Sequence, residues 1–364
     1  MKHAVIVNAK RTIIGKKSGL LKGVPPHFLI EPVFRYLSTN LVEQINDIIL
    51  GNVVGPGGNI ARLSALQAGF PLSVPGVTID RQCSAGLEAI RLACYLIQGG
   101  AGTVYLAGGT ESCSTSSFPG RARFSPENIG DPDMGIAAEN VAAEYKITRD
   151  MQDQYTEMSY ARSWNAYESS LFTDEIVPIS NHVIDEGFLK KRNIKQLLQR
   201  AKPVFQNQGT VTPVNSCGIN DGASAVLVME EQTAKEYGFQ PVLQFVDSEV
   251  SGVSPLLPGI APVSAIQSLL ERHSLTMEDI DLIEINEAFA SKVAACAKEL
   301  NIPYEKLNVR GGALALGHPY GASGAILITR LFHEVKRRKN TKYVLAAIGS
   351  GGGIGLAVLF KAYN

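Results

Sequence analysis

The sequence predicts an α/β protein built from two similar halves. Short apolar runs typical of strands alternate with helical spacings along the chain. The length of 364 residues exceeds what one hydrophobic core usually supports. The order strand, small-residue turn, helix, strand in 79–109 is repeated in 309–348, where GASGAILITRL has the small-then-helical spacing of CSAGLEAIRLA. We therefore expect an internal duplication, with halves at 1–240 and 241–364.

The first half begins with alternating strands and helices. In chain order we expect a strand (Ala4–Val7), a Gly- and Lys-rich loop (Arg11–Gly23), a glycine-rich connection (Gly51–Asn59), a helix (around Ala61–Ala68), a strand that leads to Cys83, a helix that runs to Ile97, and a buried strand that ends in a turn (Thr103–Gly109).

The middle of the chain has a different composition. Ser112–Asp133 is rich in Ser, Pro, Gly and Arg, as is typical of a surface excursion. Helical patterns run from Met134 to about Leu171, so we interpret Ser112–Gln208 as an inserted, mostly helical subdomain. The later elements are then expected as strands (Ala225–Met229, Ile280–Ile285, Tyr343–Ile348, Ile354–Phe360) and helices (Glu287–Leu300 and the end of Gly311–Phe332).

Charge and cysteine content narrow the class of protein. The 34 basic and 34 acidic side chains cancel, which argues against a nucleic acid or an anionic membrane as partner. Five widely spaced cysteines without a C-x-x-C pair favour a reducing compartment and no structural metal site. A strand begins at Ala4, which leaves no room for a signal peptide, and no apolar run would span a bilayer. We expect a soluble cytoplasmic protein.

Cys83 is the candidate nucleophile. It precedes the helical pattern that runs to Ile97, with the small residues Ser84, Ala85 and Gly86 next to it. A thiol at the first turn of a helix loses its proton more easily, because free N–H groups and the helix dipole favour an anion. The alternative is that Cys83 is a small buried apolar residue.

Two polar residues lie at turns between strands and helices. Asn286 follows the apolar strand Ile280–Ile285, where ligands often bind in α/β folds, although it could simply cap the next helix. His318 lies between Gly317 and Pro319 in a rigid loop, which suits a base or hydrogen-bond donor, although it could be an ordinary turn histidine.

GSGGGIG (Gly349–Gly355) joins two strands. Consecutive glycines let backbone N–H groups approach a ligand closely, as in an oxyanion hole. The segment is not a dinucleotide fingerprint, because a strand follows it instead of a helix. The sequence also contains no P-loop and no H-E-x-x-H motif.

Together these motifs resemble the thiolase family from end to end. The matching segments are DRQCSAGLEAI, LAGGTES, MGIAAENVA, NSCGINDGA, INEAFA, GGALALGHPYGASGA and GSGGGIGLA. The resemblance implies two duplicated mixed-sheet α/β halves in a layered arrangement, with an inserted loop domain over the coenzyme A site.

The resemblance also implies roles for individual residues. Cys83 would carry the acyl group as a thioester, and His318 would activate it. His318 and a water held by Asn286 would bind the thioester oxygen of the second substrate. The N–H groups of Cys83 and Gly351 would form the other oxyanion hole.

The coenzyme A contacts follow in the same way. Met134, Pro258 and Phe289 would line the pantetheine tunnel and acyl pocket. Lys190 and Arg192, with Lys191 between them, would contact the phosphates of coenzyme A. The family's pantetheine-contacting serine aligns with Asp247, and Ser248 is its nearest candidate here.

One position departs from the family pattern. Thiolases carry a second catalytic cysteine two residues before the glycine triplet, and here that residue is Gly349. Glycine has no acid or base, and losing such a group typically costs ~10²–10⁴ in rate. Ser350 is adjacent, but neighbouring side chains of a strand face opposite ways.

We therefore expect an acyl-CoA C-acyltransferase of the acetyl-CoA acetyltransferase or 3-ketoacyl-CoA thiolase type, with impaired condensation and a coenzyme A thioester as substrate. A hydrolase or non-condensing acyltransferase is the first alternative, and a non-catalytic acyl-CoA binding protein is the second. The Ser112–Asp133 excursion is short for the family, which often uses this region to build tetramers, so the resemblance implies a homodimer.

Overall fold

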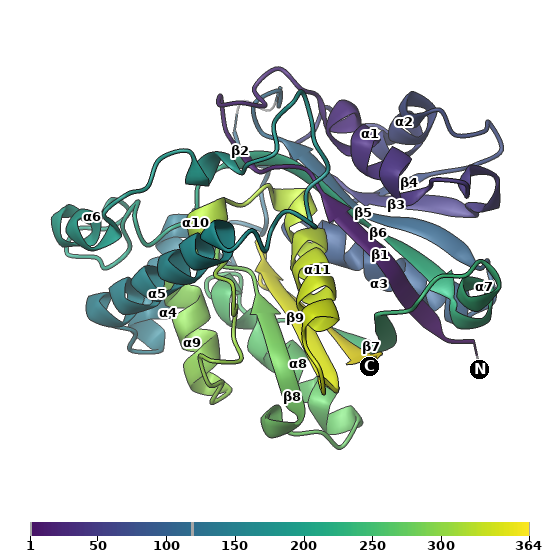
Figure 1. Ribbon diagram of the computed structural model, residues 1–364. Helices are drawn as coiled ribbons and strands as arrows, with labels where there is room; N and C mark the ends of the chain where they lie inside the picture. Colours follow the sequence, from purple (N-terminus) through teal and green to yellow (C-terminus); the bar gives the residue numbers. More distant parts are fainter. Residues whose placement is uncertain (1, 118–119, 364) are drawn as a thin grey trace.

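The computed structural model describes residues 2–117 and 120–363 and contains a ten-stranded sheet (Figure 1). The strands are β1 (Ala4–Arg11), β2 (Gly15–Lys16), β3 (Asp47–Gly51), β4 (Val77–Ile79), β5 (Val104–Ser112), β6 (Asn220–Glu230), β7 (Leu243–Gly252), β8 (Ile280–Ile285), β9 (Tyr343–Ser350) and β10 (Ile354–Ala362). Their order is β4-β3-β5-β6-β1-β7-β10-β9-β8, and β2 pairs with β6.

Helices connect and cover these strands. The α-helices are α1 (Pro26–Leu37), α2 (Ile60–Ala68), α3 (Ala85–Gln98), α4 (Met134–Glu144), α5 (Arg149–Glu168), α6 (Ile194–Arg200), α7 (Glu231–Glu236), α8 (Ala261–Arg272), α9 (Ala290–Glu299), α10 (Ala313–Leu316) and α11 (Tyr320–Arg337). Short 3₁₀ turns are η1 (Val42–Gln44), η2 (Glu186–Phe188), η3 (Pro258–Ile260) and η4 (Met277–Asp279). No helix of the described residues is both long and apolar enough to cross a membrane.

The sheet has two parts with the same plan. In the first part, β3 is parallel to β4 and β5, and β6 and β1 follow antiparallel. In the second part, β8 is parallel to β9, and β10 and β7 follow antiparallel. The two parts are joined where β1 pairs with β7, at Val5–Gln244 and Ile6–Leu243. The thiolase-like α/β fold expected from the sequence is confirmed.

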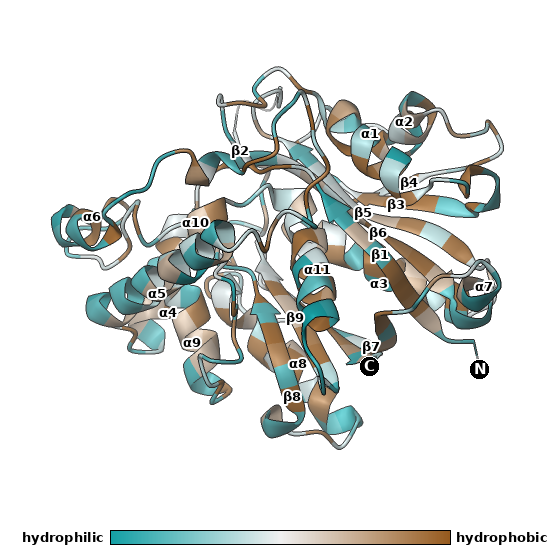
Figure 2. Cartoon of the chain, in the orientation of Figure 1, coloured by the Kyte–Doolittle hydropathy of each residue, from teal (hydrophilic) through white to brown (hydrophobic). Residues whose placement is uncertain are grey.

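The hydrophobic cores lie in layers. One face of β1, β3, β5 and β6 packs on α1 and α2, and one face of β8, β9 and β10 packs on α8 and α9. The opposite faces of both parts share a central core with α3 and α11. Alternate residues of a strand point to opposite faces, so apolar residues are needed on both, and the strands are largely brown in Figure 2.

Small residues explain why α3 and α11 approach so closely. A Cβ atom on Gly86 of α3 would lie 2.5 Å from the carbonyl oxygen of Gly321 on α11. A Cβ atom on Gly324 would collide with the backbone nitrogen of Leu87. The matching small-residue spacings of the two helices thus form their common interface. Cys83 and His318 each lie three residues before the glycines that meet there.

The inserted segment packs on the second part of the sheet. Helices α4 and α5 contact α9, and Val141, Ile147 and Tyr155 belong to the core around α8 and α9. The segment therefore shares a core with the rest of the chain, and its surface side, with α6, is largely teal in Figure 2. Residues 118 and 119 of the expected excursion lie outside the described residues, and the domain limits stay a prediction.

Several expected limits were wrong. Strand β1 runs to Arg11 and β6 begins at Asn220, so both are longer than expected. The strand expected to end in a turn at Gly109 continues to Ser112, because β5 pairs with β6 as far as Asp221. The helix expected from Glu287 begins at Ala290, because Ala288 and Phe289 instead bind the segment before β6: Cys217 N donates to Ala288 O, and Phe289 bridges Ser216.

Candidate active site

Cys83 lies in a turn before α3. The helix begins at Ala85 with Ser84 as its N-cap, so Cys83 precedes the first helical turn in which we expected it. The turn is tight, since Gln82 has a left-handed backbone with a φ of 49° and Ala85 N donates to Gln82 O at 2.8 Å. This geometry places the thiol at the entrance of α3 beside its small residues.

The thiol does not have the lowered pKa that the helix terminus predicted. Burial raises the pKa of Cys83 to about 11, although the charge of Lys292 acts in the opposite direction. The prediction was wrong because desolvation of the thiolate outweighs the electrostatic support around it. The thiol is protonated at neutral pH, so a base must accept its proton.

His318 lies immediately before α11 and is held on three sides. Its Nδ1 is 2.6 Å from the Ser323 hydroxyl, its backbone N–H donates to Asn220 Oδ1, and its Nε2 is 3.5 Å from Asn286 Nδ2. Burial, then the charge of Lys292, lowers the pKa of His318 to about 3. The imidazole is therefore neutral and able to accept a proton.

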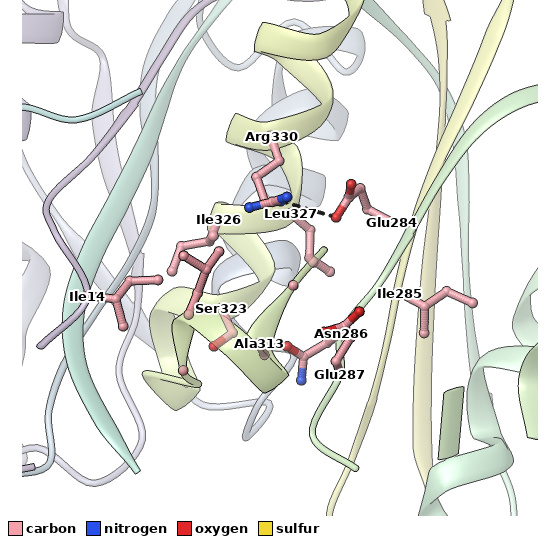
Figure 3. Close-up of a pocket in the computed structure, with 13 residues that line it drawn as sticks. Ile14, Glu284, Ile285, Asn286, Glu287, Ala313, Ser323, Ile326, Leu327 and Arg330 are labelled. Carbon is pink, nitrogen blue, oxygen red and sulfur yellow. Dashed lines mark ion pairs between the residues drawn. The ribbon is translucent and has the colours of Figure 1, made fainter. Parts of the chain in front are cut away.

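Asn286 meets His318 and does not cap a helix. The N-cap of α9 is Phe289, and Asn286 N donates to Ala347 O at 3.2 Å. Beside Asn286 and Ser323 lies a cavity of about 20 Å³, next to the ion pair between Glu284 and Arg330 (Figure 3). Such a volume accommodates about one water molecule.

The glycine-rich turn after β9 reaches the Cys83 turn. Ser350 Oγ accepts from Ser84 N at 2.9 Å and lies 2.5 Å from Ser84 Oγ, so it faces the start of α3. A Cβ atom on Gly351 would lie 2.5 Å from the Phe124 ring and 2.7 Å from Gln82 Oε1. A larger residue here would have to displace both side chains, and the glycine-rich segment lies beside the Cys83 turn.

Gly349 faces a residue that the sequence analysis missed. Lys292, on the first turn of α9, donates from Nζ to Gly349 O at 2.9 Å and is buried. A signal was present, because Lys292 lies three residues after Phe289 and four before Cys296, on the apolar face of the expected helix. Ser323 and Asn220, which hold His318, carried no comparable signal.

The residues expected to bind coenzyme A fall into three places. Met134, Pro258 and Phe289 line one narrow cavity of about 10 Å³ together with Lys292 and Gly349. Lys190 and Arg192 line a larger cavity of about 230 Å³, which extends to Gly317 beside His318.

Ser248 is not brought to these cavities. Its hydroxyl accepts from Arg91 Nε at 2.7 Å and lies 3.0 Å from the Tyr95 hydroxyl, in a polar cluster with Asp247. This packing gives Ser248 a structural environment, and the geometry offers no support for a pantetheine contact.

Comparison with known proteins identifies the family. Residues 4–232 match the model for the thiolase N-terminal domain and residues 239–362 the model for the thiolase C-terminal domain. The chain is 61% identical over 360 residues to YhfS of Bacillus subtilis (strain 168), named as an acetyl-CoA C-acetyltransferase, with 99% of each chain covered. It is 46% identical over 387 residues to VraB of Staphylococcus aureus (strain MRSA252), which has the same enzyme name, with both chains fully covered.

Two solved structures agree with this family. The Bacillus anthracis acetyl-CoA acetyltransferase superposes with a TM-score of 0.93 at 38% identity, covering 100% of this chain and 99% of that one. Human mitochondrial 3-ketoacyl-CoA thiolase in complex with CoA superposes with a TM-score of 0.91 at 34% identity, covering 100% and 98%. The chain therefore belongs to the thiolase family and is an acyltransferase of that family.

Proposed function

We propose that this protein takes an acyl group from acetyl-CoA or a 3-ketoacyl-CoA onto Cys83 and passes it to an acceptor. The observation that carries this proposal is the meeting of α3 and α11 at Gly86 and Gly321, each three residues after Cys83 or His318. This contact brings the starts of α3 and α11 together, which supports a nucleophile and a neutral base that act as a pair. That is the pairing that covalent acyl transfer needs.

Because Cys83 and His318 are both neutral, the first step is a proton transfer from the thiol to the imidazole. With its proton on Nδ1, His318 donates to Ser323, which leaves Nε2 to accept the proton of Cys83. With acetyl-CoA, the sulfur attacks the thioester carbonyl carbon, a carbon–sulfur bond to Cys83 forms as the bond to the coenzyme A sulfur breaks, and coenzyme A leaves with the proton from His318. With a 3-ketoacyl-CoA, the sulfur attacks the keto carbon, the bond between the α- and β-carbons breaks, and the α-carbon of the departing acetyl-CoA must receive a proton. We assign the N–H groups of Cys83 and Gly351 to the oxyanion. The one-water cavity beside Asn286 supports a second oxyanion site there.

Two cavities support the coenzyme A contacts. Met134, Pro258 and Phe289 gather beside Lys292 and Gly349, which supports placing the acyl end of the substrate here, although the cavity of about 10 Å³ is smaller than an acetyl group and has to widen when it binds. The cavity with Lys190 and Arg192 suits the phosphates, since two cations line it and it leads towards His318. CoA is bound in the human structure, which favours a coenzyme A thioester as substrate. That no cofactor is bound permanently stays a prediction. We also propose a cytoplasmic homodimer, to be tested by light scattering.

Carbon–carbon bond formation should be slower than acyl transfer. Gly349 offers no acid or base, and removal of such a group typically costs ~10²–10⁴ in rate. This absence favours transfer to water or another acceptor as the second candidate function.

Intact mass after incubation with acetyl-CoA tests the proposal. We expect one acetyl adduct that is lost in Cys83→Ala and kept in Cys113→Ala, whose thiol is buried. Free CoA without a new carbon–carbon bond would favour the second candidate. Binding of acetyl-CoA without any adduct, or an adduct that survives Cys83→Ala, would overturn the acyl-enzyme.

A further inference from the structure

Lys292 is a buried cation without an acidic partner. The residue is only 3% exposed, and Nζ donates to the carbonyl oxygen of Gly349. Within residues 2–117 and 120–363, no carboxylate lies at ion-pair distance from this ammonium group. Burying an unpaired charge is costly, so such a residue calls for a reason beyond packing.

The position of Lys292 supplies a reason. A Cβ atom on Gly349 would lie 3.3 Å from Lys292 Nζ, so the amine lies in contact with the point where a side chain at 349 would begin. The next residue, Ser350, binds Ser84, the neighbour of Cys83. Lys292 and Gly349 also share the narrow cavity to which we assign the acyl end of the substrate.

The surroundings favour an amine that loses its proton. Burial lowers the pKa of Lys292, and its place in the first turn of α9 adds the positive end of the helix dipole. The titratable groups that face it are Cys83, Cys217, Cys296 and His318. Burial raises the pKa of these three thiols to about 11 or 12, and that of His318 is lowered to about 3. All four are therefore neutral near pH 7.

We propose that Lys292 is the catalytic base that takes the α-proton of the second acyl-CoA, in the place left by Gly349. The inference rests on the proposed acyl-enzyme at Cys83. The neutral amine accepts a proton from the α-carbon, and that carbon attacks the carbonyl of acetyl-Cys83. A carbon–carbon bond forms, the carbon–sulfur bond to Cys83 breaks, and the ammonium returns its proton to the Cys83 thiolate. The cleaving direction reverses these steps.

Proton exchange isolates this step from condensation. The enzyme is incubated with acetyl-CoA in D₂O, and deuterium in the acetyl methyl group is followed by mass spectrometry. We expect exchange with the unmodified protein and a loss of about 10²-fold or more in Lys292→Met and in Lys292→Arg. The arginine variant keeps a positive charge but cannot become neutral, so it separates a base from an electrostatic role.

The controls use the same helix and the neighbouring thiol. Lys298 also lies on α9, but it is exposed and donates to Tyr145 O. Lys298→Met should therefore leave exchange unchanged. Cys217→Ser should also keep it, although Cys217 faces Lys292. Loss of exchange in Cys217→Ser with retention in Lys292→Met would assign the base to the thiol and overturn the proposal. Retention in Lys292→Arg would overturn it as well.

Acetylation of Cys83 is measured in every variant. If the unmodified protein acetylates Cys83 but shows no exchange, only the proposed role of Lys292 is contradicted. If it does not acetylate Cys83, the proposed function is contradicted. Should Lys292→Met fail to fold, the pH profile of the unmodified protein decides. Exchange should rise with pH and level off below the ordinary lysine value of 10.5, and a flat profile would contradict a lysine base.

Discussion

Two turns face each other at the active site, and they are equipped differently. The Cys83 turn presents a thiol, with His318 delivered by the partner helix α11. The end of β9, just before the glycine-rich turn, presents bare backbone at Gly349, and Lys292 reaches it from α9. In the proposed mechanism, acyl transfer depends on the α3–α11 pair, and proton transfer depends on a separate element. The two activities should respond separately to substitution.

The largest effect is expected at His318, which serves the acylation side. His318→Ala should slow acetylation of Cys83 by about 10²–10⁴-fold, because the protonated thiol loses its base. Release of CoA in a single turnover measures this, with the exposed His3→Ala as control. Since burial lowers the pKa of His318 to about 3, its neutral form prevails throughout pH 5–9. A steep loss of acetylation as pH falls from 7 to 5 would contradict the neutral base.

Gly349→Cys tests the proton-transfer side of the active site. We expect carbon–carbon bond formation to rise about tenfold or more while acetylation of Cys83 stays unchanged, because a thiol regains the position of the missing base. The new Cβ must fit 2.7 Å from Pro258 O and 3.0 Å from Pro262 Cδ, so η3 has to shift slightly.

Gly349→Ala is the matched control, since it adds the same Cβ without the sulfur. Combining Gly349→Cys with Lys292→Met should restore condensation that Lys292→Met alone has lost. An unchanged rate in both cysteine variants would show that the missing thiol does not limit the reaction.

A smaller effect on stability is expected at the contact between α3 and α11. Gly324→Ala should lower the free energy of unfolding by about 1–3 kcal/mol, because its Cβ meets the backbone of Leu87 and α3 and α11 must separate. Urea unfolding measures this. Gly252→Ala is the control, since nothing lies within 4 Å of its Cβ. Equal midpoints would contradict the close packing of the two helices.

The sequence revealed more of the Cys83 side of the active site than of the Gly349 side. Periodicity predicted β8 to the residue, and the repeated small-residue spacing indicated the duplicated halves. Cys83, His318 and Asn286 stood out because backbone-restricting or small residues frame them. The pKa of Cys83 could not be predicted, because desolvation depends on elements far apart in the chain.

Lys292 was missed for a related reason. Its role depends on Gly349, which lies 57 residues away along the chain. A lysine on an apolar helix face can snorkel to solvent, and only the packing of α9 against Gly349 shows that this one does not.

The smallest effect is expected far from both turns, at the basic pair. Replacing Lys190 and Arg192 together by alanine should raise KM for acetyl-CoA several-fold with kcat unchanged, because partly exposed phosphate contacts bind the ground state and transition state equally. Steady-state release of CoA measures both constants. Lys191→Ala is the matched control, since Lys191 pairs with Glu168 and does not line the cavity. A fall in kcat without a change in KM would place the pair in the chemistry and would contradict a phosphate-binding role.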